Sequence, residues 1–216
     1  MAGAAKRLQV AQVESQLGRR AHRPDVVDFQ PLAGAAFATL VAVPAQHLRP
    51  KRAPALRAGD VILEIGTFAG RSAFPALRGA LANPARTEPP QFHVIDIPAD
   101  SMAETREAIA RANLTPYCHL FQGVLKDFVQ RWSITPTMVF LDGDHSYDGV
   151  RTDLEILSRY LKPGTPILVH DFVKSENDEG AIGARKAAQE WSAAGHARFM
   201  GCFGCCALYV TAVGGL

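Results

Sequence analysis

Two short stretches of this sequence end an apolar run with residues that can do chemistry. The first, MVFLDGDH, spans Met138 to His145, and the second, VHDF, spans Val169 to Phe172. Each is typical of a buried strand, and ligands bind at the carboxyl ends of strands in an open parallel sheet. Three aspartates and two histidines at adjacent strand ends are costly to bury unless they hold a metal ion, move a proton or form a dense hydrogen-bond network. We therefore expect the chemistry of the protein at this edge of the sheet.

A glycine-bearing turn is the second candidate for ligand binding. VILEIGTFAGRSA places Gly66 and Gly70 where a strand passes into a helix. Glycine allows a sharp turn and a close approach of a ligand to the main chain, and the start of a helix offers free N–H donors to an anion. The G-x-x-x-G spacing departs from the G-x-G-x-x-G fingerprint of dinucleotide-binding turns, so the glycines alone are weak evidence.

Two acids strengthen the case for this turn. Glu64 precedes Gly66 and could accept from an ammonium group. Asp96 ends the next strand, a position from which a carboxylate can bind both hydroxyls of a ribose. The alternative is a generic nucleotide-type fold in which these acids are incidental.

From Asp60 onward, short apolar runs alternate with helical patterns. This alternation predicts right-handed crossovers and an α/β fold, with a mostly parallel sheet covered by helices on both faces. The strands are expected at 61–65, 92–97, 119–123, 138–142, 165–172, 197–203 and 205–213, and the helices after the glycine turn and at 101–113, 126–132, 146–161 and 181–194.

Residues 1–59 have a different composition and predict a helical extension or lid before a domain over 60–216. They hold nine Lys/Arg and three Asp/Glu, with helical patterns at 4–18 and 32–43. A lid, an oligomer contact, a basic arm toward nucleic acid and a plain solvated face all remain open, as does a homodimer. No stretch reaches the roughly 20 apolar residues that a membrane span needs, and no secretory signal is evident, so we expect a cytosolic protein without membrane contact.

The four cysteines, Cys118, Cys202, Cys205 and Cys206, form no disulfide-scaffold pattern in a chain of 216 residues. The CFGCC cluster is a candidate metal site. However, Cys205 and Cys206 begin an apolar run, CCALYVTAV, so burial in a core strand is the favoured interpretation.

Over residues 60–213 the sequence resembles the class I S-adenosylmethionine-dependent methyltransferases. Glu64 to Gly70 resembles their first motif, Asp96 the ribose-binding acid of the second, and Gln122-Gly123-Val124 the turn at the adenine edge. The resemblance implies a Rossmann-like seven-stranded sheet that binds S-adenosyl-L-methionine. The cofactor-binding residues that it implies are Glu64, Gly66, Thr67, Phe68, Gly70, Ser72, Asp96, Gln122, Gly123, Val124 and Asp142.

Within that class, FLDGDHSYDGVRTDLEIL and VHDF are similar to the metal-dependent O-methyltransferases that act on catechols, sugars and macrolides. The resemblance implies that Asp142 and Asp171 bind magnesium and that His145 is the general base. His170 stands where the family has a second acid. An imidazole ligand there shifts the preference from Mg²⁺ toward Mn²⁺, Fe²⁺ or Zn²⁺.

The neighbouring residues have less certain roles. Asp144 is either a further ligand or the group that orients His145, and Asp148 and Asp153 are expected to cap and solvate the helix after Ser146. Tyr147 either lines the pocket or packs, and residues 173–182 form either a mobile loop over the site or a plain solvated one.

The favoured function is therefore methyl transfer to a hydroxyl of a small molecule. The alternatives are a metal-independent methyltransferase of another substrate, such as RNA, and a nucleoside-binding module without catalysis. The chain lacks the aromatic-rich basic stripe on which bases stack, which disfavours nucleic acid. The intact acids Glu64, Asp96, Asp142 and Asp171 disfavour the module.

Overall fold

The computed structural model describes residues 60–73, 77, 81, 88–173 and 179–212. The expected N-terminal helical extension lies outside these residues, and so does the centre of the expected loop, at 174–178. Among the described helices, none is both long and apolar enough to cross a membrane.

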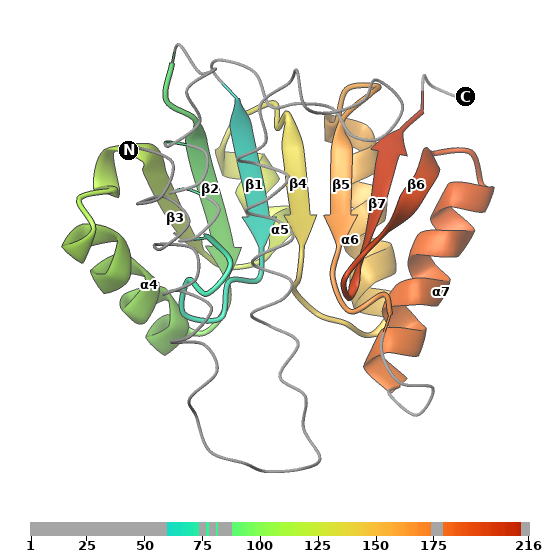
Figure 1. Cartoon of the computed structure of the whole chain (residues 1–216), viewed down its shortest axis with the longest axis horizontal. Coiled ribbons are helices and arrows are strands. Elements are labelled where there is room, and N and C mark those ends of the chain that lie inside the picture. The colour runs from blue at the N-terminus through green and yellow to red at the C-terminus, as the bar shows by residue number, and fades with distance from the viewer. Residues whose placement is uncertain (1–59, 74–76, 78–80, 82–87, 174–178, 213–216) are drawn as a thin grey trace, which may run out of the picture.

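Seven strands form one sheet in the order β3-β2-β1-β4-β5-β7-β6. The first five strands pair in parallel, and β7 runs antiparallel to both β5 and β6 (Figure 1). The prediction of a mostly parallel seven-stranded sheet is thereby confirmed. The strands are β1 (Val61–Ile65), β2 (Gln91–Asp96), β3 (Cys118–Gln122), β4 (Met138–Leu141), β5 (Pro166–Val169), β6 (Ala197–Phe203) and β7 (Cys206–Thr211).

The described helices begin and end close to where the sequence pattern predicts. The N-terminus of α6 has a cap, because the side chain of Ser146 accepts a hydrogen bond from the N–H of Gly149 at 3.1 Å. Beyond its end, Gly164 adopts φ +86°, which reverses the chain into β5. The helices are α4 (Ala99–Arg111), η2 (Thr115–Tyr117), α5 (Leu125–Arg131), α6 (Tyr147–Tyr160) and α7 (Glu179–Ala193).

Alternating strand residues divide the core between the two faces of the sheet. Ile62 and Phe140 pack on one face with Ile109 of α4, whereas Leu63 and Val139 pack on the other face with α5, α6 and α7. Figure 1 shows α4 at the β3 edge and α5 and α6 behind the sheet. This arrangement follows from the two-residue period of a strand, which sends neighbouring side chains to opposite faces.

The register of the parallel strands brings their carboxyl ends to one edge. Ile65 of β1 is paired with both Ile95 of β2 and Leu141 of β4, and Leu141 is paired with Val169 of β5. The residues that follow these strands are consequently neighbours, with the N–H of Asp142 donating to Ile65 O at 2.8 Å. The lower edge of the sheet in Figure 1 therefore gathers the strand-end residues.

The amino-terminal halves of β2 and β3 hold a second histidine pair. His93 in β2 and His119 in β3 stack with ring centroids 4.7 Å apart, and His119 Nε2 lies 2.7 Å from Gln91 Oε1. Trp132 packs edge-on against His93 at 5.4 Å. Burial and the neighbouring His119 lower the pKa of His93 to about 4, so His93 is neutral near pH 7.

Candidate active site

A pocket of about 900 Å³ opens at the carboxyl edge of the sheet. Its walls come from the turns after β1, β2, β3 and β4, from the starts of α4 and α5, and from residues 148–156 of α6. The sequence-predicted site residues that line it are Gly66, Thr67, Phe68, Asp96, Gly123, Val124, Asp142 and His145. The predicted site residues that are not on its wall are Glu64, Gly70, Ser72, Gln122, His170 and Asp171.

Asp96 fastens the glycine turn to the end of β2. Its Oδ2 accepts hydrogen bonds from the N–H groups of Thr67 and Phe68, both at 3.1 Å, and from the hydroxyl of Ser101 at 2.9 Å. Phe68 and Ala69 adopt left-handed backbone angles, with φ of 41° and 64°. The carboxylate thus compensates a turn that side-chain-bearing residues rarely adopt.

Glu64 lies beneath this turn. It shares the sheet face of Ile62, is 0% exposed, and accepts a hydrogen bond from the hydroxyl of Ser72. Burial raises the pKa of Glu64 well above its usual value, and its Oε2 has no hydrogen-bond partner among the described residues. Glu64 therefore supports the turn from below, and it does not stand on the pocket wall where we expected it to meet an ammonium group.

Gly66 is required where the β1 turn packs against the end of β4. Its φ is +81°, and a Cβ at this position would overlap the backbone of Asp142 and lie 2.7 Å from the Cα of Gly143. Only glycine satisfies both the angle and the contact. This close packing places the turn beside Asp142.

The strand-end acids and histidines form one cluster. His145 Nε2 lies 3.1 Å from Asp142 Oδ1, and His145 Nδ1 lies 2.7 Å from Asp171 Oδ2. His170 Nδ1 lies 2.5 Å from Asp142 Oδ1 and 3.1 Å from Asp171 Oδ1. Each imidazole therefore contacts both carboxylates.

The four side chains of this cluster differ in their exposure to solvent. The side chain of His145 is 28% exposed, whereas those of Asp142, His170 and Asp171 are 5%, 1% and 2% exposed. Burial by itself lowers the pKa of both histidines. The pairs with Asp142 and Asp171 outweigh that effect, raising the pKa of His145 to about 9 and that of His170 to about 10.

The turn before β7 holds the end of β5 in place. Asp171 adopts a left-handed φ of 54°, and the N–H groups of Phe172 and Val173 both donate to Cys205 O, at 2.8 and 3.1 Å. Cys205 Sγ lies 3.2 Å from His170 Nε2. The sequence did not indicate this contact, although Cys205 and Cys206 are buried as the core interpretation of CFGCC expects.

The prediction that Asp144 ligates a cation or orients His145 receives no support from this geometry. Asp144 Oδ1 accepts from the N–H of Ser146 at 2.9 Å, and both ring nitrogens of His145 face other carboxylates. Asp171 Oδ2, and not Asp144, lies beside His145 Nδ1, at 2.7 Å. Tyr147 packs, with its hydroxyl donating to Glu190 of α7 at 2.5 Å.

Helix α6 supplies a pocket wall that the sequence interpretation missed. Asp148 lines the pocket but is exposed and pairs with Arg151 at 3.5 Å, as a solvating acid should. Asp153 is a correction, because it is half-buried on the pocket wall, where burial and the nearby Asp144 raise its pKa to about 6. The helical spacing of the sequence indicates this wall, because the lining residues Gly149, Thr152, Asp153 and Ile156 fall on one face of α6.

Comparison with known proteins identifies the family. A methyltransferase-domain family matches residues 63–172, or 110 of the 216 residues. No curated protein sequence matches the chain significantly.

Solved methyltransferase structures share the fold. An O-methyltransferase from Bacillus cereus in complex with S-adenosylhomocysteine is 18% identical, with a TM-score of 0.61 over 94% of this chain and 89% of that one. The O-methyltransferase TomG from Streptomyces achromogenes, involved in tomaymycin synthesis, is also 18% identical, with a TM-score of 0.58 over 88% of this chain and 83% of that one. The strand order, with β7 reversed, agrees with the methyltransferase fold that the sequence motifs predict and that these structures share. The chain therefore belongs to the methyltransferase-domain family and is a class I S-adenosylmethionine-dependent methyltransferase.

Proposed function

We propose that the protein is an O-methyltransferase that moves the methyl group of S-adenosylmethionine to a hydroxyl of a small molecule, using a divalent cation and His145 as general base. The observation that carries the proposal is the cluster of Asp142, His145, His170 and Asp171, whose first two members line the pocket. Both similar structures named above are O-methyltransferases, which supports the same reaction class.

The cofactor would lie across the glycine turn. The N–H groups of Thr67 and Phe68 are held by Asp96, and Gly123 and Val124 face them across the pocket. Asp96 Oδ1 accepts only from the N–H of Ile97 among the described residues, at 2.8 Å. A carboxylate oxygen has two lone pairs, so Asp96 keeps the capacity to accept from a ribose hydroxyl.

The residues that would hold the cation are Asp142, His170 and Asp171. Two buried carboxylates need positive charge nearby, and two imidazoles with raised pKa supply it in this structure. A donor set of two carboxylates and an imidazole fits Mg²⁺ and, better, Mn²⁺ or Fe²⁺. When bound, such a cation lowers the pKa of a coordinated hydroxyl.

His145 is placed to receive the hydroxyl proton. Asp171 Oδ2 holds Nδ1 at 2.7 Å from the buried side, which leaves Nε2 as the nitrogen nearer the pocket-lining Asp142. The pKa of about 9 favours the imidazolium form of His145. Any additional positive charge beside the two carboxylates lowers this pKa and so favours the neutral imidazole, which can accept a proton. As Nε2 takes the proton, the oxygen forms its bond to the methyl carbon, the carbon–sulfur bond of the sulfonium breaks, and S-adenosylhomocysteine is released.

The charge of the pocket disfavours an RNA substrate. The described lining carries one lysine, Lys126, against five aspartates, Asp96, Asp142, Asp144, Asp148 and Asp153. A phosphate backbone would be repelled there, whereas a sulfonium and an ammonium group are attracted. A small neutral or cationic methyl acceptor fits this pocket better. That the protein acts in the cytosol stays a prediction.

The test measures cofactor binding and turnover separately. Calorimetry should show S-adenosylhomocysteine binding, and labelled methyl groups should appear on a member of a panel of catechols, phenols and sugars in the presence of Mn²⁺ or Mg²⁺. Asp171→Ala should abolish turnover but leave cofactor binding within about threefold, because Asp171 lies off the pocket wall. The matched control is Glu155→Gln on the exposed face of α6. Full turnover in EDTA would remove the cation from the proposal, and absence of cofactor binding would remove the function.

A further inference from the structure

The two ends of the pocket differ in character. Asp142 and His145 form the polar end. The other end lies between the turns after β2 and β3 and helix α6, and its wall is mainly apolar, with Ile97, Val124, Leu125 and Ile156 beside Lys126 and Thr152. Ile97 is 63% and Val124 43% exposed, so apolar side chains face open space here. A flat ring inserted between them would cover this surface.

The apolar end adjoins the group proposed to bind a sugar. Ile97 follows Asp96 directly, and the side chain of Gln122, before the β3 turn, donates to Ile97 O at 3.3 Å. A ligand whose sugar hydroxyls meet Asp96 would carry its attached ring into the slot beside Ile97. The slot is thus positioned for the base of a nucleoside.

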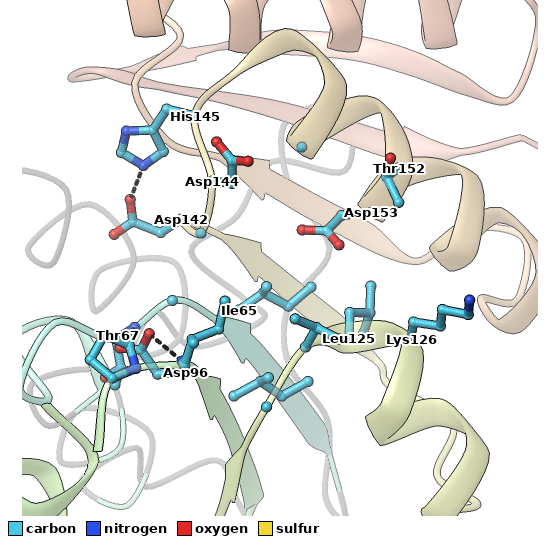
Figure 2. A pocket seen from close by; sticks show the side chains of 18 of the residues that line it. Ile65, Thr67, Asp96, Leu125, Lys126, Asp142, Asp144, His145, Thr152 and Asp153 are labelled. Atoms are coloured by element: carbon cyan, nitrogen blue, oxygen red, sulfur yellow. Dashed lines mark hydrogen bonds and ion pairs between the residues drawn. The ribbon is translucent and has the colours of Figure 1, made fainter. Parts of the chain in front are cut away.

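One carboxylate projects into this apolar end. Figure 2 shows Asp153 extending from α6 toward the side of Ile65 and Leu125, away from His145. In the part of the chain that the structure describes, no group donates a hydrogen bond to the Asp153 carboxylate or forms an ion pair with it, whereas Asp148 and Glu155 on the same helix both pair with Arg151, at 3.5 and 3.0 Å.

An unpartnered, half-buried carboxylate loses hydration without a compensating bond. Its pKa of about 6 reflects this cost, which burial imposes and Asp144 increases. Gly143 is a neighbour of Asp153 on the pocket wall, and an added Cβ there would lie 3.9 Å from Asp153 Oδ2 and 3.3 Å from the side chain of Ile65. The lack of a side chain at Gly143 keeps the space beside the carboxylate open, and a ligand with hydrogen-bond donors would fill it.

We propose that Asp153 selects the base of the cofactor by accepting a hydrogen bond from the exocyclic amine of adenine. The inference rests on the cofactor lying in this pocket as proposed above. It predicts that the protein distinguishes a 6-amino purine from a 6-oxo purine, because a carbonyl at that position would point one acceptor at another. Asp153 is then a specificity-determining residue contributed by α6.

The test compares S-adenosylhomocysteine with its deaminated analogue, S-inosylhomocysteine, by calorimetry on the full chain. The wild-type protein should bind the adenosyl compound at least about tenfold more tightly, as expected when a hydrogen bond is replaced by two facing acceptors. Asp153→Asn, whose amide can donate to the 6-oxo group, should weaken adenosyl binding, strengthen inosyl binding and bring the ratio below about threefold. Glu155→Gln removes a charge from the exposed side of the same helix and should leave the ratio unchanged.

The outcomes that would overturn the role of Asp153 differ from the outcome that would refute the proposed function. Equal wild-type affinities for the two compounds overturn the inference, whether or not the Asn variant folds. An unchanged ratio in a folded Asp153→Asn protein also overturns it, while cofactor binding itself stands. Failure of the wild-type protein to bind S-adenosylhomocysteine at all would instead refute the proposed function.

Discussion

Two histidine pairs in the same sheet show how neighbours decide what a residue does. His145 and His170, at the carboxyl edge, lie with ring centroids 5.7 Å apart between two carboxylates. His93 and His119, in the amino-terminal halves of β2 and β3, stack at 4.7 Å among aromatic rings and are called the amino-edge pair below. The pKa rises to about 9 for His145 and falls to about 4 for His93.

The difference lies in the available counter-charges. Burial lowers the pKa of both residues, and only the carboxyl edge supplies aspartates that reverse the effect. A histidine that neighbours hold near a change of protonation can move a proton, whereas one held neutral in an aromatic cluster can only pack. We therefore expect chemistry from the carboxyl-edge pair and packing alone from the amino-edge pair.

The largest expected effect is on the rate of methyl transfer, which should differ between variants of the two histidine pairs. His145→Ala should lower kcat by about 10²- to 10⁴-fold, the usual contribution of a general base, while cofactor binding changes little. His93→Phe, which fills the same aromatic cluster, should leave kcat within about twofold. Steady-state methyl transfer on the two variants measures both values, and equal losses would break the comparison.

The next effect tests how the carboxyl-edge cluster is held. Gly66→Ala should cost about 3 kcal/mol or more of unfolding free energy and displace Asp142, because it combines a left-handed backbone with overlap on the β4 end. Gly164→Ala is the matched control, since Gly164 has φ +86° but nothing within 4 Å of its added Cβ. It should cost about 1 to 2 kcal/mol, from the backbone angle alone. Urea denaturation measures both, and similar losses would show that the contact with Asp142 is not tight.

The smallest effect concerns the amino-edge pair and pH. The folded-state pKa of about 4 lies below the unfolded value near 6.5, so the stabilising contribution of neutral His93 is complete above pH 6.5 and is lost as the pH falls toward 4. The loss amounts to at most about 3 kcal/mol. The unfolding free energy of wild type relative to His93→Phe should decline over this range. A constant difference between wild type and His93→Phe would mean that His93 accepts a proton in the folded state.

Much of the fold could be predicted because its signals are local. Each apolar run from Val61 onward became a strand or a helix close to its expected bounds, and MVFLD and VHDF proved to be adjacent strand ends. The burial of Glu64 was also available from the two-residue period, which puts it on the face of Ile62.

The rest of the site depends on contacts between distant segments. The approach of Cys205 to His170 arises because the turn before β7 accepts hydrogen bonds from the chain after β5, and no local pattern encodes that pairing. The contact of His145 Nδ1 with Asp171, and not with Asp144, has the same origin, since two strand ends must meet first. Asp153 was misread because an acid in an amphipathic helix is usually solvated, although its helical face coincides with that of Ile156.

The central claim is that the carboxyl-edge cluster is a cation site beside a bound cofactor. A crystal structure with S-adenosylhomocysteine and Mn²⁺ tests it most directly. Our account predicts the cofactor in the pocket with its ribose at Asp96, and anomalous density for manganese between Asp142 and Asp171. Density for the cofactor with no anomalous signal in the cluster, or a cofactor bound away from the pocket, would contradict it.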